Sequence, residues 1–231
     1  MENKVFGIKS IERLIDSKET NNIIECLLKV KLEATPINEG GNAFIFIPLE
    51  KSLQNACIKK TKEKPQIQYN NINDEHKIQK KLKEMGLRTP LTLVSFKTVE
   101  GEYFIMERIK GYSVREIIKD STLMPEKFHF ETFCKSLDEQ IAIMHNKDKM
   151  QNGIYHRDLH EGNVMIDEEG LPVIIDFGTA VEGTGSDNTY SESVSMYNPK
   201  KERYEFVSGY FKDDIEMSKI IKASLKGFIK E

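Results

Sequence analysis

Two polar motifs that flank a predicted β-hairpin constrain the fold of this chain more than any other feature. The first is the octapeptide H-R-D-L-H-E-G-N at residues 156–163, and the second is D-F-G at 176–178. Between them, the apolar runs 164–167 and 173–175 surround the turn 168–170, a pattern typical of two short strands joined by a tight turn. The hairpin would bring the end of the first motif and the start of the second to one site.

Length and composition place the chain among ordinary globular proteins. Its 231 residues suffice for one large domain or two small lobes, and its formal net charge of −3 gives no overall basic field that would favour nucleic acid. The start of the chain lacks an apolar signal core, and no apolar run is as long as a membrane-spanning helix. The cysteines are scattered and odd in number, which predicts reduced thiols in a cytoplasmic compartment; they are Cys26, Cys57 and Cys134.

Apolar periodicity predicts a first half of the chain that is rich in strands and a second half that is rich in helices. Strands are expected at 43–49, 56–59, 91–98 and 103–107, and helices at 22–32, 72–85, 125–145 and 212–229. The capping box Ser113-Val114-Arg115-Glu116 predicts a further short helix, and the Ser-, Thr-, Asn- and Gly-rich residues 179–204 predict a loop. The pattern predicts an α+β fold with a strand-rich N-lobe over residues 1–109 and a helical C-lobe over residues 110–231.

The two motifs resemble the catalytic loop H-R-D-x-x-x-x-N and the D-F-G of the protein-kinase-like superfamily. The resemblance covers about residues 36–220 and is most specific between positions 158 and 178. It implies a bilobal kinase fold that uses ATP and Mg²⁺. By this resemblance Asp158 is the catalytic base, and Asn163 and Asp176 hold the metal through oxygen atoms. Arg157 belongs to the form of the motif that often receives a phosphorylated activation loop.

The same resemblance assigns a lysine and a glutamate in the N-lobe. Ala56-Cys57-Ile58-Lys59 is similar to the V-A-I-K strand of the family, so Lys59 is expected to bind the α- and β-phosphates. Glu75 lies on the apolar face of the 72–85 helix, where an unpaired charge would be costly, and is the expected partner of Lys59. Glu84, near the end of that helix, is the alternative partner.

Two further segments are expected to bind the nucleotide. Against the family pattern G-x-G-x-x-G-x-V the chain reads N-E-G-G-N-A-F-I from residue 38, so only one signature glycine is kept. The phosphate-covering residues in this segment are Asn38, Gly40, Gly41, Ala43 and Ile45. The segment that resembles the interlobe linker supplies backbone hydrogen bonds to adenine and the back of its pocket; its residues are Met106, Glu107 and Ile109.

Departures from the family leave three functions open. No A-P-E follows the D-F-G, and one more helix follows, at whose start Asp213 or Asp214 is expected to brace the catalytic loop. The leading hypothesis is a minimal Ser/Thr protein kinase, similar to small kinase effectors that bacteria inject into a host cytosol. It implies a protein substrate, autophosphorylation and an activating partner. His160 instead resembles the D-L-H-P-G-N of aminoglycoside and choline kinases, which favours a small-molecule acceptor. A non-catalytic ATP-binding scaffold is the third alternative.

Overall fold

The chain folds into two compact units that interleave along the sequence. The computed structural model describes residues 5–6, 36, 38–39, 43–47, 55–63, 71–98, 101–145, 153–183, 194–198, 203–207 and 213–228. The first unit comprises Met1–Lys77, Leu91–Arg108 and Ser195–Phe206, and the second comprises Ile78–Pro90, Ile109–Val194 and Val207–Glu231. The sequence predicts two lobes that meet after residue 109. That boundary stays a prediction.

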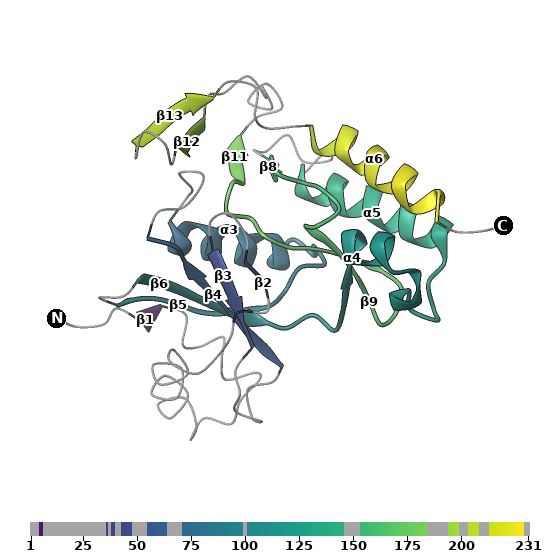
Figure 1. Cartoon of the computed structure of the whole chain (residues 1–231), viewed down its shortest axis with the longest axis horizontal. Helices are drawn as coiled ribbons and strands as arrows, with labels where there is room; N and C mark the ends of the chain where they lie inside the picture. The colour runs from purple at the N-terminus through teal and green to yellow at the C-terminus, as the bar shows by residue number, and fades with distance from the viewer. Residues whose placement is uncertain are drawn as a thin grey trace. The chain divides into compact units, whose positions relative to one another are not determined.

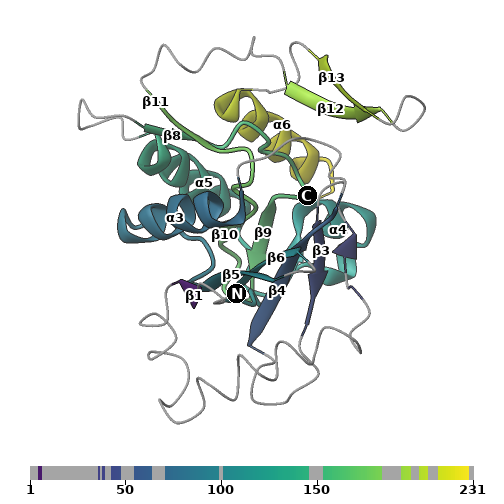
Figure 2. The ribbon, with the colours of Figure 1, turned by 90° about the vertical axis from the view of Figure 1, so that its left-hand side faces the viewer.

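The first unit is built on a six-stranded antiparallel sheet in the order β1-β5-β6-β4-β3-β2 (Figure 2). Its strands are β1 (Val5–Phe6), β2 (Asn38–Glu39), β3 (Ala43–Phe46), β4 (Ala56–Thr61), β5 (Thr92–Thr98) and β6 (Gly101–Glu107). In this register Lys59 of β4 lies opposite Ile45 of β3 and Phe104 of β6. Lys59 therefore lies on an inner strand of the sheet, with β3 on one side and β6 on the other.

Helix α3 (Ile72–Glu84) follows the predicted pattern closely. The Asn71 side chain accepts a hydrogen bond from the Asp74 backbone N–H at 3.0 Å, as an N-cap does. The helix ends before Gly86, whose φ of +95° is readily adopted by glycine. Its buried face carries Glu75 and Leu82, so the apolar periodicity identified the correct face.

The second unit combines helices with a three-stranded sheet, in the order β10-β9-β7, and a two-stranded sheet of β11 and β8. Its elements are β7 (Gly111–Ser113), α4 (Val114–Lys119), η2 (Ser121–Leu123), α5 (Phe130–Met144), β8 (Gly153–Tyr155), β9 (Val164–Asp167), β10 (Pro172–Ile174), β11 (Val181–Gly183) and α6 (Asp214–Lys226). The predicted hairpin is present as β9 and β10, and the predicted capping box opens α4. Helices α5 and α6 lie side by side (Figures 1 and 2).

A buried apolar cluster holds the second unit together. Its members include Leu82 and Leu87 from the segment around the end of α3, Phe133 of α5 and Ile221 of α6. The cluster also contains Phe177 of the D-F-G motif, fully buried. The core therefore fixes the backbone on which the two polar motifs are carried.

The structure corrects several expected boundaries. The strand expected at 43–49 ends at residue 46, and that expected at 56–59 continues to residue 61. The helix expected at 125–145 begins at 130, and that expected at 212–229 spans 214–226. The helix expected at 22–32 lies outside the described residues. Within the described ranges no helix is long and apolar enough to cross a membrane.

The segment expected to be a loop at 179–204 contains strands. β11 pairs with β8, so that Val181 lies opposite Tyr155. β12 (Val194–Asn198) and β13 (Arg203–Val207) form a separate two-stranded sheet. Backbone hydrogen bonding to a partner strand gives these polar sequences a regular structure that local composition does not indicate.

Gly111 in β7 leaves no room for a side chain. Its φ is +153°, and a Cβ would lie 2.1 Å from the Ile166 carbonyl oxygen and 2.9 Å from the Cα of Asp167 on the paired strand β9. We expect Gly111→Ala to lower the free energy of unfolding by roughly 2–4 kcal/mol, measured by urea denaturation. Gly227→Ala is the control, because φ is −65° there and the nearest contact of a Cβ is 3.6 Å. Equal effects of the two substitutions would contradict this account.

Candidate active site

The first unit contains a buried ion pair between Lys59 and Glu75. The Lys59 Nζ lies 2.8 Å from Glu75 Oε1, and both side chains are less than a tenth exposed. The expected pairing is therefore present, whereas Glu84 is exposed at the end of α3. A buried charge is stable only when it is paired, so Glu75 holds the lysine ammonium of β4 in a fixed position.

The hairpin of β2 and β3 carries the described part of the phosphate-covering segment. Asn38 lies opposite Ile45 in the register, and Ala43 at the start of β3 is buried. Gly40 and Gly41 lie outside the described residues. Their role in covering phosphates stays a prediction.

The end of β6 carries the predicted adenine-binding residues. The Glu107 backbone N–H donates to the Leu91 carbonyl at 2.9 Å, and its carboxylate accepts from the Leu91 N–H at 2.9 Å. The Glu107 carbonyl accepts a long contact from the Cys57 thiol, at 3.7 Å. Its role in binding adenine stays a prediction. Met106, half-buried in β6, and Ile109, half-buried after it, keep their predicted roles as expectations.

The 156–163 loop of the second unit is braced by a buried carboxylate. Asp214 of α6 accepts hydrogen bonds from the backbone N–H groups of His156 and Arg157 at 2.8 and 3.0 Å. It also contacts Nε2 of His145 at 2.9 Å. Arg157 has a φ of +69°, unusual for a residue with a side chain. Of the two aspartates that the sequence left open, Asp214 braces the loop, whereas Asp213 caps α6.

Asn163 and Asp158 are joined within this loop. The Asn163 Nδ2 donates to the Asp158 carbonyl oxygen at 2.9 Å, so Oδ1 is the atom of this side chain that could bind a metal. The Asn163 carbonyl accepts from the Ile175 N–H at 3.0 Å, so Asn163 is held beside the residue that precedes Asp176. The hairpin therefore brings both predicted metal ligands to one end, as its sequence indicated.

Asn163 and Asp176 suit a magnesium ion whose remaining ligands come from phosphate and water. Mg²⁺ prefers oxygen ligands and is commonly bound by one or two side chains together with phosphate and water. Among the described residues there is no cluster of three His, Cys, Asp or Glu side chains that would hold a metal without other ligands. An amide oxygen and a carboxylate are therefore a donor set suited to a metal that arrives with a nucleotide.

Asp158 lies in an environment that opposes its charge. Burial raises the pKa of Asp158 and the Asp176 carboxylate raises it further, whereas His160, His156 and Arg115 act in the opposite direction. Within the described part of the chain no donor is hydrogen-bonded to its carboxylate; its backbone N–H donates to His156 Nδ1 at 3.3 Å. The carboxylate is thus available to accept a hydrogen bond from a hydroxyl group.

His160 is fixed by two donors. Its Nδ1 accepts from the Gly162 backbone N–H at 2.9 Å and contacts the Arg115 guanidinium at 3.2 Å. Burial lowers the pKa of His160, although the Asp158 carboxylate raises it. The ring therefore joins the loop to α4 through Arg115.

Comparison with known families agrees with the motifs. The sequence pattern of the family described as "Protein kinase domain" matches residues 37–199, well over half of the chain. The chain belongs to the protein kinase family. The matched range contains both the Lys59–Glu75 pair and the loop braced by Asp214.

Individual relatives of this kinase-family chain are distant. It is 30% identical over 125 residues to the probable serine/threonine-protein kinase PknB of Bifidobacterium longum, a match that covers 50% of this chain and 17% of that protein. It is 26% identical over 118 residues to the serine/threonine-protein kinase PknB of Mycobacterium tuberculosis, covering 48% and 18%. The matches thus span less than a fifth of either relative. A solved structure described as "PpkA-294 apo form" has a TM-score of 0.48 and 17% identity, over 63% of this chain and 57% of that one.

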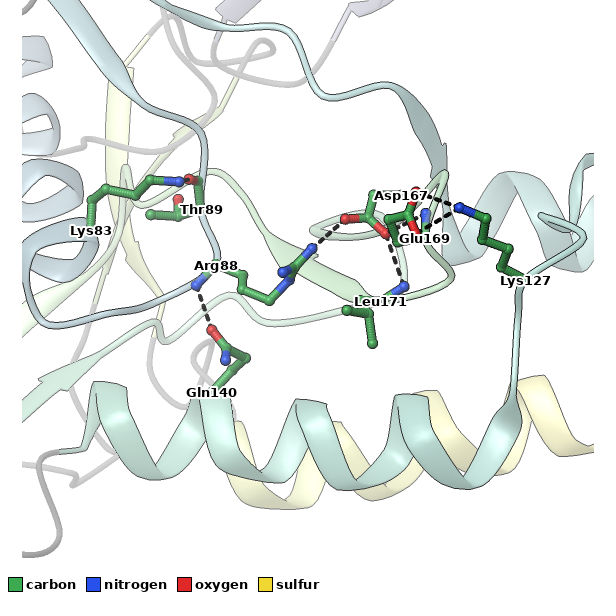
Figure 3. Close-up of polar contacts among 8 residues, drawn as sticks. All are labelled: Lys83, Arg88, Thr89, Lys127, Gln140, Asp167, Glu169 and Leu171. Atoms are coloured by element: carbon green, nitrogen blue, oxygen red, sulfur yellow. Dashed lines mark hydrogen bonds and ion pairs between the residues drawn. The ribbon is translucent and has the colours of Figure 1, made fainter.

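A polar network that the sequence did not reveal anchors the segment after α3 in this kinase-family chain (Figure 3). The Arg88 guanidinium donates to Asp167 of β9, and its backbone N–H donates to the Gln140 side chain of α5. Asp167 also accepts from the Leu171 N–H at 2.9 Å, which closes the hairpin turn. Arg88 and Asp167 are 79 residues apart, and no local pattern links them. The network ties the α3–β5 connection to the hairpin that carries Asn163.

Proposed function

We propose that the chain is an ATP-dependent phosphotransferase that transfers the γ-phosphate to Ser or Thr hydroxyl groups of a protein. The observation that carries the proposal is the braced loop, in which Asn163 is fixed by the Asp158 carbonyl and the Asp158 carboxylate remains available. Phosphoryl transfer depends on positioning and charge neutralisation more than on covalent chemistry, and a rigid loop with these groups supplies both.

Each proposed role follows from the chemistry of the side chain. Asp158 accepts a hydrogen bond from the acceptor hydroxyl and orients it toward the γ-phosphate. Asn163 and Asp176 hold Mg²⁺, which neutralises phosphate charge when bound. Lys59, kept in place by Glu75, binds the α- and β-phosphates. The Glu107 carbonyl and the Ile109 N–H bind adenine beside Met106, and the phosphates are covered by Asn38, Gly40, Gly41, Ala43 and Ile45.

A protein acceptor is supported by the names of the relatives, which are serine/threonine-protein kinases. A small-molecule acceptor is the second candidate, and one observation favours it. His160, in place of the lysine usual in protein kinases, is held at the catalytic loop by Gly162 and Arg115. Autophosphorylation, an activating partner and action in a host cytosol stay predictions.

The proposal is tested by incubating the purified chain with γ-labelled ATP and Mg²⁺, alone, with a mixture of protein acceptors, and with an aminoglycoside or choline. We expect label on protein from the wild type, none after chelation of Mg²⁺, and none from Asp176→Ala, because the variant lacks a metal ligand. ATP binding is measured in parallel by calorimetry. Transfer only to an added aminoglycoside or choline would replace the protein acceptor with a small molecule. ATP binding without transfer to any acceptor would support a scaffold, and no ATP binding would refute the proposal.

A further inference from the structure

A cavity of about 300 Å³ in the second unit lies beside the catalytic loop. It is formed by helix α4, the loop residue Glu161, the C-terminal half of α6 and Phe228, which follows that helix. The residues that line it are Arg115, Ile118, Lys119, Glu161, Ser224 and Phe228. Phe228 is 45% exposed although its side chain is large and apolar, so the cavity opens to solvent along an apolar edge.

The charges around this cavity are predominantly positive. Arg115 and Lys119 are exposed, and within the described ranges neither forms an ion pair with a carboxylate. The acidic residue of α4 points elsewhere, because Glu116 accepts from Ser113 in the capping box. Glu161 is the only acidic lining residue, and its carboxylate accepts from the Ser224 hydroxyl at 3.4 Å. The cavity therefore has two positive side chains, Arg115 and Lys119, and one negative side chain, Glu161, which already accepts a hydrogen bond. This balance of charge favours an anionic ligand.

The cationic side of the cavity is adjacent to the proposed base. Arg115 contacts His160, which follows Asp158 by two residues, and the Arg115 backbone N–H donates to the Glu161 carbonyl at 3.0 Å. A Cβ at Gly162 would lie 3.1 Å from the Arg115 guanidinium carbon and 2.8 Å from the His160 ring. The absence of a side chain at residue 162 thus leaves room for the guanidinium against the loop. Arg115 is also near enough to lower the pKa of Asp158, against the larger effect of burial.

We propose that this cavity is a subsite for an acidic side chain of the acceptor polypeptide, so that Ser or Thr residues with a neighbouring carboxylate or phosphate are preferred. The inference rests on the proposed function and adds a substrate class to it. The Arg115 guanidinium can bind a carboxylate or phosphate through two parallel N–H groups, and Lys119 adds a second positive charge. Ile118 and Phe228 offer apolar surface to the stem of the same side chain or of its neighbour.

The test measures kcat/KM for a set of serine peptides in an alanine background. Each peptide carries one substitution, which is aspartate, phosphoserine or lysine. Across the set, the substituted position runs from four residues before the acceptor serine to four residues after it. For the wild type we expect one position at which aspartate or phosphoserine is preferred over alanine by about fivefold, the size of a partly exposed charge pair. Lys119→Glu is expected to remove the preference or to turn it toward lysine. Lys219→Glu, an exposed charge reversal on α6 away from the cavity, is the matched control and should keep it.

A binding measurement separates failure of this inference from failure of the proposed function. Fluorescence anisotropy follows a fluorescein-labelled acidic peptide as it binds the wild type, Lys119→Glu and Lys219→Glu without ATP. Transfer with no acidic preference, or a preference that Lys119→Glu leaves intact, would overturn the subsite and leave the kinase. Absence of transfer to every acceptor would overturn the proposed function. In that case weaker peptide binding by Lys119→Glu alone would support the anionic site, and equal binding by all three proteins would exclude it.

Discussion

An Asp158→Asn protein is expected to bind ATP as the wild type does and to transfer its γ-phosphate about 10²–10⁴-fold more slowly. The amide has nearly the same shape as the carboxylate but cannot accept a proton at neutral pH. The two backbone hydrogen bonds of residue 158, to His156 Nδ1 and from Asn163 Nδ2, do not involve its side chain and should persist. A single-turnover experiment with a protein acceptor measures the rate of transfer, and calorimetry measures the affinity for ATP. We expect only the rate to change.

Glu168→Gln is the matched control for this substitution. It makes the same change from carboxylate to amide at an exposed position in the turn between β9 and β10. Its transfer rate should equal that of the wild type. If Asp158→Asn also kept the wild-type rate, Asp158 would not be the base, and the loop would serve only to hold the nucleotide.

The Lys59–Glu75 pair was predicted from the family resemblance, which supplied Lys59 and a helix glutamate as its partner, and from local periodicity, which singled out Glu75. The 72–84 helix has a single apolar face, and Glu75 is a charged residue on that face, so it required a buried partner. The β9–β10 hairpin was predictable for a similar reason, since two apolar runs around a turn leave few alternatives. The residues that decide the hairpin are close in sequence, whereas Lys59 and Glu75 are 16 residues apart on β4 and α3, and the resemblance supplied the link between them.

Contacts between distant segments could not be predicted in the same way. Arg115 belonged to the capping box, and its sequence neighbours gave no sign of His160 as a partner. The pairing of Arg88 with Asp167 depends on the packing of the α3–β5 connection against the hairpin, which no motif encodes. The cavity had one local indication in the sequence. Arg115 and Lys119 are four positions apart, so on a helix they share a face and give it two positive charges.

Adjacent aspartates at the start of α6 show the limit of residue-level prediction most clearly. Asp213 and Asp214 are both suited to a helix N-terminus by charge. The structure separates them by burial: Asp213 is half-exposed and caps the helix, whereas Asp214 is fully buried and faces the loop. Only the rotation of α6 against α5 and the loop decides which aspartate is the brace.

Asp214→Asn is expected to lower the free energy of unfolding by about 2–4 kcal/mol, because the amide leaves at least one buried donor without an acceptor. In the wild type both carboxylate oxygens accept hydrogen bonds, one from the Arg157 N–H and the other from the His156 N–H and His145 Nε2. An amide has one oxygen and one NH₂ group, so a donor must face another donor. Urea denaturation of the whole chain measures the loss.

The same substitution should slow phosphoryl transfer through the position of Asp158. The Arg157 backbone, with a φ of +69°, is held by its hydrogen bond to Asp214, and without that bond it can relax and displace the next residue. We therefore expect a lower kcat with an unchanged KM for ATP. Asp213→Asn is the control on the adjacent residue, because asparagine caps a helix as well as aspartate does, and it should leave stability and kcat near wild type. Equal losses in the two variants would show that α6 needs negative charge at its N-terminus and that Asp214 is not a specific brace of the loop.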